Sequence, residues 1–271
     1  MRRTIVLLFV AAQSAFSAFE HTAGGALSIS MGGAAAALMN DPWSATANPG
    51  NLPSIAERTL GMFYSPQPYG LTELSTGSLA LVQPLSFGSV GLFASRYGFS
   101  LYRETEWALS FGLPLVDRLD AGVGICYNVL SIEGYGTAGT LGINAGILIR
   151  LTDDLRWGTF ATNVNAPRIG EIRERLPQTF ATGVAFQPVE EAVLALDLFK
   201  DVRFPMELRF GVEYAPVALL RLRAGTGTEP SSLSAGAGLR YDFVGLDYAF
   251  TAHPELGVTH QISLLLDLNR F

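Results

Sequence analysis

Residues 206–214 read Met-Glu-Leu-Arg-Phe-Gly-Val-Glu-Tyr, with an apolar residue at every even position and Glu207, Arg209, Gly211 and Glu213 between them. Successive side chains of a β-strand point to opposite faces, so this alternation predicts a strand with one apolar and one polar face. The stretch 192–200, Ala-Val-Leu-Ala-Leu-Asp-Leu-Phe-Lys, carries the same pattern, and a short turn separates the two runs. Together they predict a β-hairpin.

Similar alternating runs recur along the chain from residue 58 onward, with turn signals between them. They lie near residues 58–64, 75–83, 86–97, 102–113, 118–132, 137–151, 155–165, 177–187, 191–199, 205–215, 217–226, 232–242, 243–251 and 257–270. Each run is close to the length that a tilted strand needs to cross a membrane. The predicted fold class is therefore all-β, a transmembrane antiparallel β-barrel of about fourteen strands. A water-soluble β-sandwich, with the apolar faces turned inward, is the structural alternative.

The composition favours a barrel in lipid. Hydrophobic residues make up 49% of the chain and charged residues 15%, whereas about 25% is usual for a soluble domain. The formal charge is −6 and Lys200 is the only lysine, so the chain offers no basic surface for nucleic acid. The expected location is the cell outer membrane, and the expected surroundings of the barrel are outer-membrane lipid.

The first 57 residues differ from the rest of the chain. Residues 1–17 have a basic start, a short apolar core and small residues at the end, which is typical of a signal peptide. Residues 18–57 are rich in small residues and turn signals, and we interpret them as an N-terminal plug or hatch segment. Residues 58–271 then form the barrel. A fourteen-strand barrel encloses more space than its own side chains fill, which leaves room for such a plug.

Two turn-rich motifs in the expected plug carry most of its sequence signal. The first is Met31-Gly32-Gly33, and Asp41-Pro42 stops any helix that follows it, because proline disfavours helix at the preceding residue. The second is Asn48-Pro49, which adds a turn.

Charged residues on the polar phase of the later strands form the second candidate group. They are Asp197, Glu207, Arg209, Glu213, Arg221, Arg223, Arg240, Asp242, Asp247 and Asp267. One interpretation is a selective pore or a catalytic group of barrel-lining acids. The other is that arginines and carboxylates on neighbouring strands neutralise one another in the lumen and anchor the plug. The mixed signs on consecutive strands favour the second interpretation.

No pattern in the sequence indicates a catalytic, metal or cofactor site. Residues 134–139 match the glycine spacing of a dinucleotide-binding loop, but no helix follows, so a hairpin loop explains them. His21, His253 and His260 have no metal-like spacing, and Cys126 lies in an apolar run typical of inert packing. We therefore expect no enzyme activity and no cofactor.

The chain resembles the FadL-like outer-membrane barrels, particularly the PorV/PorQ group. The resemblance begins at 31–34, Met-Gly-Gly-Ala, and continues through Asn-Asp-Pro at 40–42 and Asn-Pro-Gly-Asn-Leu at 48–52. Gly50 and Asn51 depart from the Ala and Gly of the group's pattern. Further similar pieces follow in the group's order at 174–188, 192–197, 233–239, 246–250 and 257–264.

The resemblance implies a fourteen-strand outer-membrane barrel with an N-terminal segment in its lumen. PorV and PorQ belong to type IX protein secretion, which implies secreted proteins or secretion-machinery components as partners. FadL moves long-chain fatty acids, which implies instead a passive conduit for hydrophobic small molecules. A purely structural outer-membrane protein is a third interpretation.

Barrels of this kind usually end in an aromatic residue that faces the lipid. In this sequence Phe271 is out of phase with Ile262. Either a bulge shifts the register of the last strand, or Leu268 takes the place of the aromatic residue.

Overall fold

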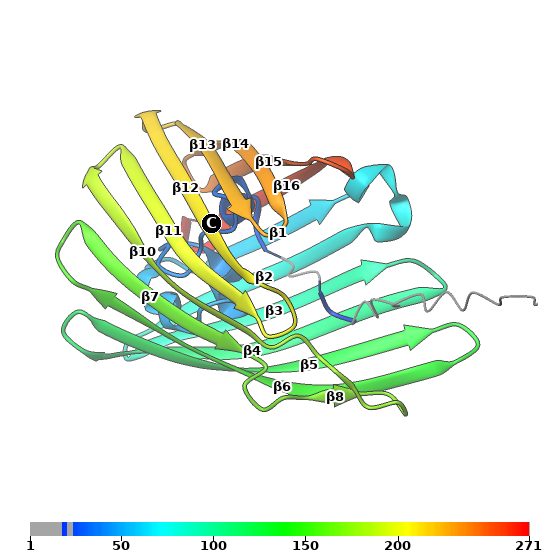
Figure 1. Ribbon diagram of the computed structural model, residues 1–271. Helices are drawn as coiled ribbons and strands as arrows, with labels where there is room; N and C mark the ends of the chain where they lie inside the picture. Colours follow the sequence, from blue (N-terminus) through cyan, green and yellow to red (C-terminus); the bar gives the residue numbers. More distant parts are fainter. Residues whose placement is uncertain (1–17, 21–23, 271) are drawn as a thin grey trace, which may run out of the picture.

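The computed structural model describes residues 18–20 and 24–270; the expected signal peptide, His21 and Phe271 lie outside this part. Fourteen antiparallel strands form one closed barrel in which sequence neighbours pair and the last strand closes on the first (Figure 1). The barrel strands are β1 (Thr59–Ser65), β2 (Thr76–Leu85), β3 (Gly88–Gly98), β4 (Tyr102–Val116), β5 (Leu119–Ile132), β6 (Gly136–Arg150), β7 (Leu155–Thr162), β10 (Thr179–Val189), β11 (Ala192–Asp201), β12 (Met206–Val217), β13 (Leu220–Thr228), β14 (Ser231–Tyr241), β15 (Val244–His253) and β16 (Gly257–Asp267). The predicted fold class and the predicted strand number are confirmed.

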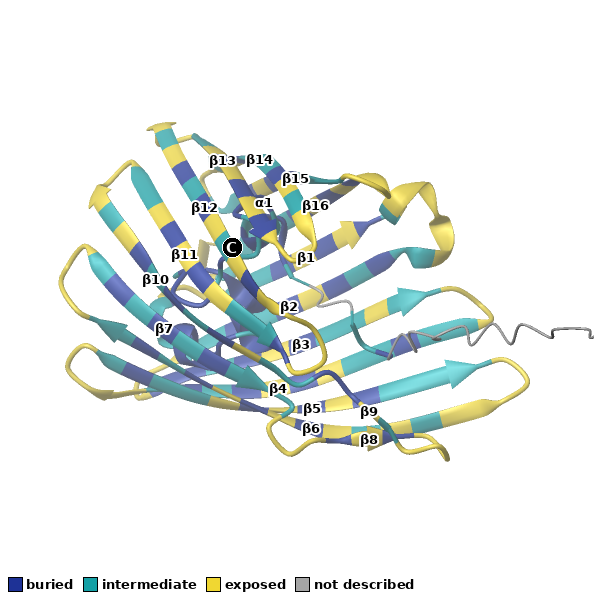
Figure 2. Ribbon diagram, viewed as in Figure 1, coloured by how far each residue is buried: buried dark blue, intermediate teal, exposed yellow. Residues whose placement is uncertain are grey.

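The apolar phase of each strand faces outward. On β12, Leu208 and Phe210 are 42% and 41% exposed, whereas Glu207 and Glu213 are 9% exposed and face the lumen. The same alternation appears as bands of burial along the strands (Figure 2). A water-soluble sandwich would bury the apolar rows, so this arrangement excludes that alternative. Closure also pairs the edge strands, which leaves no open sheet edge.

The two ends of the barrel differ in their connections. At one end, which we call the turn end, tight turns such as 86–87, 117–118 and 242–243 join the strands. At the other, which we call the loop end, the longest connections are 66–75 and 163–178. The loop at 66–75 contains two short turns, η3 (Pro68–Gly70) and η4 (Thr72–Leu74), and the loop at 163–178 contains the two-residue strands β8 (Arg168–Ile169) and β9 (Glu174–Arg175).

Four predicted strand ends lie three residues from the observed ones, and two of these have a local cause. The run expected to reach residue 165 ends at Thr162, because Asn163 and Asn165 turn away and bond to the edge of β6. The last strand was expected to reach residue 270, but β16 ends at Asp267 and η5 (Leu268–Arg270) follows. The side chain of Asp267 accepts a hydrogen bond from the Asn269 amide, which starts this turn. The described pairs of β16 contain no bulge, and Leu268 lies beyond the strand.

Residues 26–54 lie inside the barrel, and we call them the plug. They contain α1 (Ala26–Ser30), η1 (Pro42–Ala45) and η2 (Pro49–Ser54), joined by irregular chain (Figure 1). No helix among the described residues is both long enough and apolar enough to span a membrane.

Candidate functional site in the plugged lumen

The plug contacts lumen-facing residues or backbone of all fourteen barrel strands. The contacts are Gly61 and Ser78 with Trp43, Gly91 and Ser110 with Ala45, Gly122 with Pro49, the Ile147 carbonyl with Asn48, Gly158 and Ala181 with Ala36, Asp197 with Ala35, Gly211 with Met31, Gly225 and Ser234 with Gly32, β15 with α1, and Ser263 with Ala26. Material that crosses the barrel must therefore pass between plug and wall, displace part of the plug, or leave through the wall.

Met31-Gly32-Gly33 brings the plug backbone against β12 and β13. Both glycines have positive φ, +68° and +78°, a conformation that side chains disfavour. A Cβ on Gly32 would lie 2.5 Å from the Thr226 nitrogen, so only glycine fits against this wall. Met31 is fully buried, and its backbone packs on Gly211 of β12. The motif is therefore the point at which two backbones meet without a side chain between them.

Asp197 on β11 holds the next part of the plug. Its Oδ2 accepts hydrogen bonds from the amides of Ala35 and Ala36, each at 2.8 Å. Asp197 is opposite Arg209 in the strand register, but no ion pair joins the two. The guanidinium of Arg209 instead pairs with Glu207 on its own strand at 2.8 Å and stacks on the Phe199 ring. Asp197 is thus bound to the plug, and Arg209 to Glu207 and Phe199.

Asp41-Pro42 starts the turn that places Trp43. The carboxylate of Asp41 caps η1 by accepting from the Trp43 amide at 3.1 Å, and Pro42 fits the first position of the turn. Burial raises the pKa of Asp41 from 3.8 to about 6. The Trp43 ring is buried, packs edge-on against Phe63 and donates its Nε1 hydrogen to Ser78 at 3.0 Å.

Asn48-Pro49 fastens the plug to itself and to the wall. The Oδ1 of Asn48 caps η2 through the Gly50 amide, and its Nδ2 donates to the carbonyls of Ala36 and Ile147 at 2.7 and 3.1 Å. Gly50 lies so close to β6 that a Cβ there would be 2.8 Å from the Ile147 Cα. This contact leaves no room for a side chain at residue 50.

Most of the remaining predicted charges form one chain across β12–β15 on the turn-end side of Met31. Arg223 lies at its centre with a fully buried guanidinium, which binds Glu213 and Asp247 at 2.6 Å each. Arg221 extends the chain from Glu213 at 2.8 Å, and Arg240 extends it from Asp247 at 2.7 Å. Opposite charges on adjacent strands thus neutralise each other in the lumen.

The last two predicted lumen charges, like Asp197, Glu207 and Arg209, lie outside this chain. Asp242 sits in the turn between β14 and β15, where it pairs with Arg270 at 3.2 Å, both residues being well exposed. Asp267 ends β16 and pairs with the same arginine at 3.3 Å. Asp242 was wrongly placed on the lumen-facing row, because a turn residue has no part in the strand's alternation.

Several polar lumen-facing residues on the earlier strands were not predicted from the sequence. Asp120 and Arg150 form a bidentate pair near the turn end. Asn144 donates to the Thr46 carbonyl of the plug and accepts from the Asn163 amide, so it links the plug to the loop at 163–178. At the loop end, Glu104 is 5% exposed and bonds to the Tyr102 hydroxyl at 2.6 Å. All of them lie on the same phase as the small lumen-facing residues of their strands, and that phase was the available signal.

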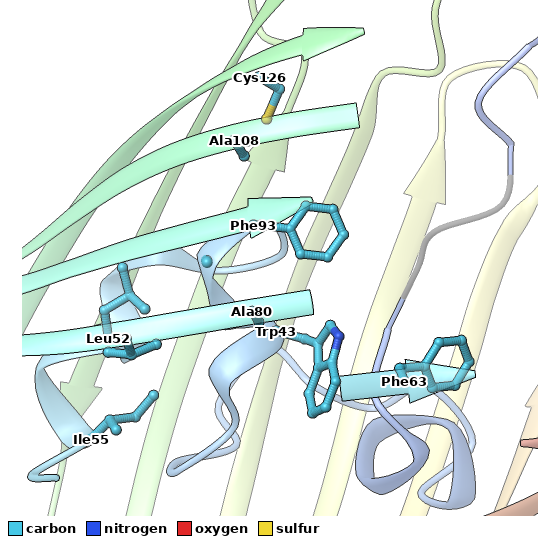
Figure 3. Packing of buried hydrophobic residues seen from close by; sticks show 10 residues of the cluster. Trp43, Leu52, Ile55, Phe63, Ala80, Phe93, Ala108 and Cys126 are labelled. Atoms are coloured by element: carbon cyan, nitrogen blue, oxygen red, sulfur yellow. The ribbon is translucent and has the colours of Figure 1, made fainter. Parts of the chain in front are cut away.

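The side of the plug that faces β1–β5 is mainly apolar. Trp43, Ala45 and Leu52, together with Ile55 directly after the plug, pack against lumen-facing wall residues there (Figure 3). The wall residues are Phe63, Ala80, Val82, Phe93, Ala108 and Cys126. Cys126 is free and buried within this cluster. The plug is therefore held by apolar packing on one side and mainly by hydrogen bonds and close backbone approach on the other.

No group of histidine, cysteine or carboxylate side chains in the described part of the chain could hold a metal ion. His260 faces outward on β16 and pairs with the Tyr248 hydroxyl at 2.6 Å, and His253 accepts from the amides of the turn that follows it. Residues 134–139 span the β5–β6 turn and the start of β6, as the hairpin interpretation predicted.

No protein-family model matches the chain, and no curated protein matches its sequence. Solved barrels do resemble it. CymD, a monoaromatic hydrocarbon channel, has a TM-score of 0.68 at 15% identity over 93% of this chain and 99% of CymD. The toluene transporter TbuX of Ralstonia pickettii has a TM-score of 0.63 at 15% identity over 89% of this chain and 96% of TbuX. A FadL homologue of Pseudomonas aeruginosa has a TM-score of 0.61 at 13% identity over 90% and 98%.

At these identities the likeness shows a shared fold. The chain therefore has the FadL-like barrel fold that the sequence resemblance implied, and these three structures give no support to the finer PorV/PorQ assignment.

Proposed function

We propose that this protein is an outer-membrane channel that lets small hydrophobic molecules pass along the apolar side of its plug. The observation that carries the proposal is the asymmetric plug contact. On β1–β5 the plug meets the wall mainly through aliphatic and aromatic side chains, with hydrogen bonds from Trp43 to Ser78 and from Ser110 to the Ala45 carbonyl. Elsewhere the wall holds the plug through Asp197 and through the Ile147 carbonyl, which accepts from Asn48. Opening a mainly apolar contact for an apolar solute leaves fewer hydrogen bonds unmade than opening a polar one.

The shared fold supports the same direction, since CymD and TbuX are described as a hydrocarbon channel and a toluene transporter. The outward apolar rows and the expected signal peptide support placement in the outer membrane. Short turns at one end and longer loops at the other then put the loop end outside the cell. We also propose that the protein is not an enzyme, because His260 faces outward and His253 is bonded to its own turn.

The decisive experiment measures entry of radiolabelled toluene into cells that produce the protein. We expect faster entry than in cells without it, and no change in the entry of a sugar of similar size. Trp43→Ala removes the largest plug side chain on the apolar side, so it should raise toluene entry severalfold further.

Leu38→Ala is the matched control for Trp43→Ala. Leu38 is also a buried plug residue, but it packs in the cluster of Met31, Ala34 and Ala195, away from β1–β5. Toluene entry should stay at the wild-type rate in this variant, with folding of both variants checked by heat-modifiable migration in gels. Equal effects of the two substitutions would contradict a path on the apolar side, and no entry above background would contradict a toluene channel altogether.

The sequence resemblance favours a second candidate, a surface protein of type IX-like secretion. The loop at 163–178 fits it, because this loop is long and Ile172 there is 86% exposed at the loop end. Most other loop-end connections are short, which leaves little surface for a large protein partner. The test is to extract the barrel in detergent and identify the proteins that co-purify with it. Several secreted proteins with a common C-terminal domain among them would favour this candidate over the channel.

A further inference from the structure

The outward face of the barrel carries charge at three places. In the fourteen barrel strands of the described chain, Asp, Glu, Lys and Arg face the lumen except for Arg96, Arg103 and Lys200. All three are cationic and all three lie near the loop end. Lys200 donates to the Phe204 carbonyl of its own hairpin. The two arginines have no ion-pair partner among the described residues, and the buried Nε of Arg103 has no hydrogen-bond partner there.

Arg96 and Arg103 sit side by side on β3 and β4. Arg96 pairs with Thr105 in the register, and Arg103 pairs with Gly98, so the two arginines are diagonal neighbours on the same face. Diagonal positions of this kind are about 7–8 Å apart, which lets two guanidinium groups reach one anion. Residues of this outward face on the neighbouring strands, Gly77 on β2 and Ser131 on β5, add no carboxylate.

A hollow in the outer wall lies directly beside the arginines. It has a volume of about 510 Å³, and both arginines line it together with Met62, Leu79 and Trp107. The register places Leu79, Ala94, Trp107 and Tyr127 in one row across β2–β5. This row lies two residues from Arg96 toward the turn end. Gly77, which has no side chain, and Ala94, which has a small one, line this hollow between larger neighbours.

The hollow continues toward the turn end as an apolar groove. This second part has a volume of about 580 Å³ and shares Leu79, Ala94 and Trp107 with the first. Its remaining outward lining is aliphatic apart from Tyr127: Leu60, Leu81, Leu92, Leu109 and Ile125. On the outside of the barrel, the hollow beside the two arginines is therefore continuous with an apolar groove.

We propose that this surface is a binding site for an anionic lipid, one whose phosphate-bearing headgroup has a net negative charge. Arg96 and Arg103 bind the phosphate, since guanidinium groups match phosphate oxygens in charge and geometry. An acyl chain lies in the groove along Leu79, Leu92 and Leu109. Two arginines that merely reached for water at the membrane surface would need no such groove. The proposal rests on the placement of the barrel in a membrane made under Proposed function, but not on what the lumen carries.

Trp107 provides a local probe of this site, because it lines both parts of the groove and is 57% exposed. Trp43 is buried in the plug, so Trp157→Phe leaves Trp107 as the lipid-facing tryptophan. This variant is placed in phosphatidylcholine liposomes that contain a minor share of phosphatidylglycerol, with bromine on the acyl chains of one lipid or the other. We expect brominated phosphatidylglycerol to quench the Trp107 fluorescence more than its share of the bilayer predicts. The excess should correspond to an enrichment of this lipid at the site of roughly fivefold for each arginine.

Arg96→Gln with Arg103→Gln should abolish this enrichment, and Lys200→Gln, the matched removal of an outward cation elsewhere, should leave it unchanged. Equal quenching by the two lipids in the variant with both arginines intact would overturn the lipid site while leaving the channel proposal standing. Loss of the enrichment on addition of millimolar inorganic phosphate would overturn the lipid as the occupant and indicate a free-phosphate site. No quenching by either lipid would show that the wall does not face lipid, and would overturn the membrane placement as well.

Discussion

Gly32 shows how a single residue fixes the distance between plug and wall. Its positive φ and its contact with the Thr226 nitrogen each require a residue without a Cβ. Conformation alone makes glycine favourable in many turns, and Gly70 is such a case, because its φ is +81° and a Cβ added there would meet no atom within 4 Å. Close approach to backbone is the additional constraint at Gly32, since backbone atoms cannot rotate out of the way.

Gly32→Ala is therefore expected to destabilise the protein more than Gly70→Ala. Gly70→Ala should cost about 1–2 kcal/mol, the usual cost of a side chain at positive φ. Gly32→Ala adds a clash with β12 and β13 and should cost about 2 kcal/mol more, within the range of an overpacked core. Urea unfolding in lipid vesicles measures both. Similar values for the two variants would mean that the plug can move off the wall without loss.

At the scale of the element, the charge chain on β12–β15 links four strands through buried side chains. Arg223 contacts two carboxylates that are themselves buried. Removing Arg223 would leave Glu213 with Arg221 and Asp247 with Arg240, but each carboxylate would lose a buried hydrogen bond to a charged group.

Arg223→Met should accordingly lower the free energy of unfolding by about 3–5 kcal/mol, because it removes two hydrogen bonds to charged groups that each contribute about 1.5–3 kcal/mol. Arg270→Met is the matched control, because Arg270 pairs with Asp242 where both side chains are more than half exposed. Its loss should cost less than about 1 kcal/mol, as exposed pairs usually do. The two are compared by urea unfolding in the same vesicles, and a small loss in Arg223→Met would show that water reaches the chain from the turn end.

The strands could be predicted from the sequence and the plug contacts could not. Alternation on β12 reports a local property, since lipid on one side and polar lumen on the other act on each strand separately. The partners of Met31 lie on β12 and β13, some 180 residues further along the chain, and no local pattern encodes that distance. Strand ends such as Thr162 were missed because Asn163 and Asn165 take their hydrogen bonds from β6. Glycines on the inward phase of β4–β7 were the one sequence signal of the plug's tight fit.

For the whole molecule, we expect the plug to decide whether the lumen conducts. It contacts every barrel strand, although its own secondary structure amounts to three short turns or helices. Its hold on the wall comes from fit and from hydrogen bonds to Asp197, Asn144 and Ser234.

A barrel that lacks residues 26–54 should therefore conduct ions. We expect single-channel conductance in planar bilayers to rise well above that of the intact protein, because an open barrel of this strand number leaves an aqueous lumen. An intact protein with Trp43→Ala should show no comparable rise, since most plug contacts remain. An unchanged conductance after the deletion would contradict the view that these residues close the lumen.

The seam between β1 and β16 also sets an order of assembly. Trp43, Leu52 and Ile55 meet strands that follow them closely in the chain, so these contacts can form while the sheet is still open. Contacts of Ala26 with Ser263 and of Gly32 with Ser234 span more than two hundred residues, so they must wait until the last strands arrive. The early strands thus pack on the apolar side of the plug first. The hydrogen bonds on its polar side form last, when β16 pairs with β1 and closes the barrel.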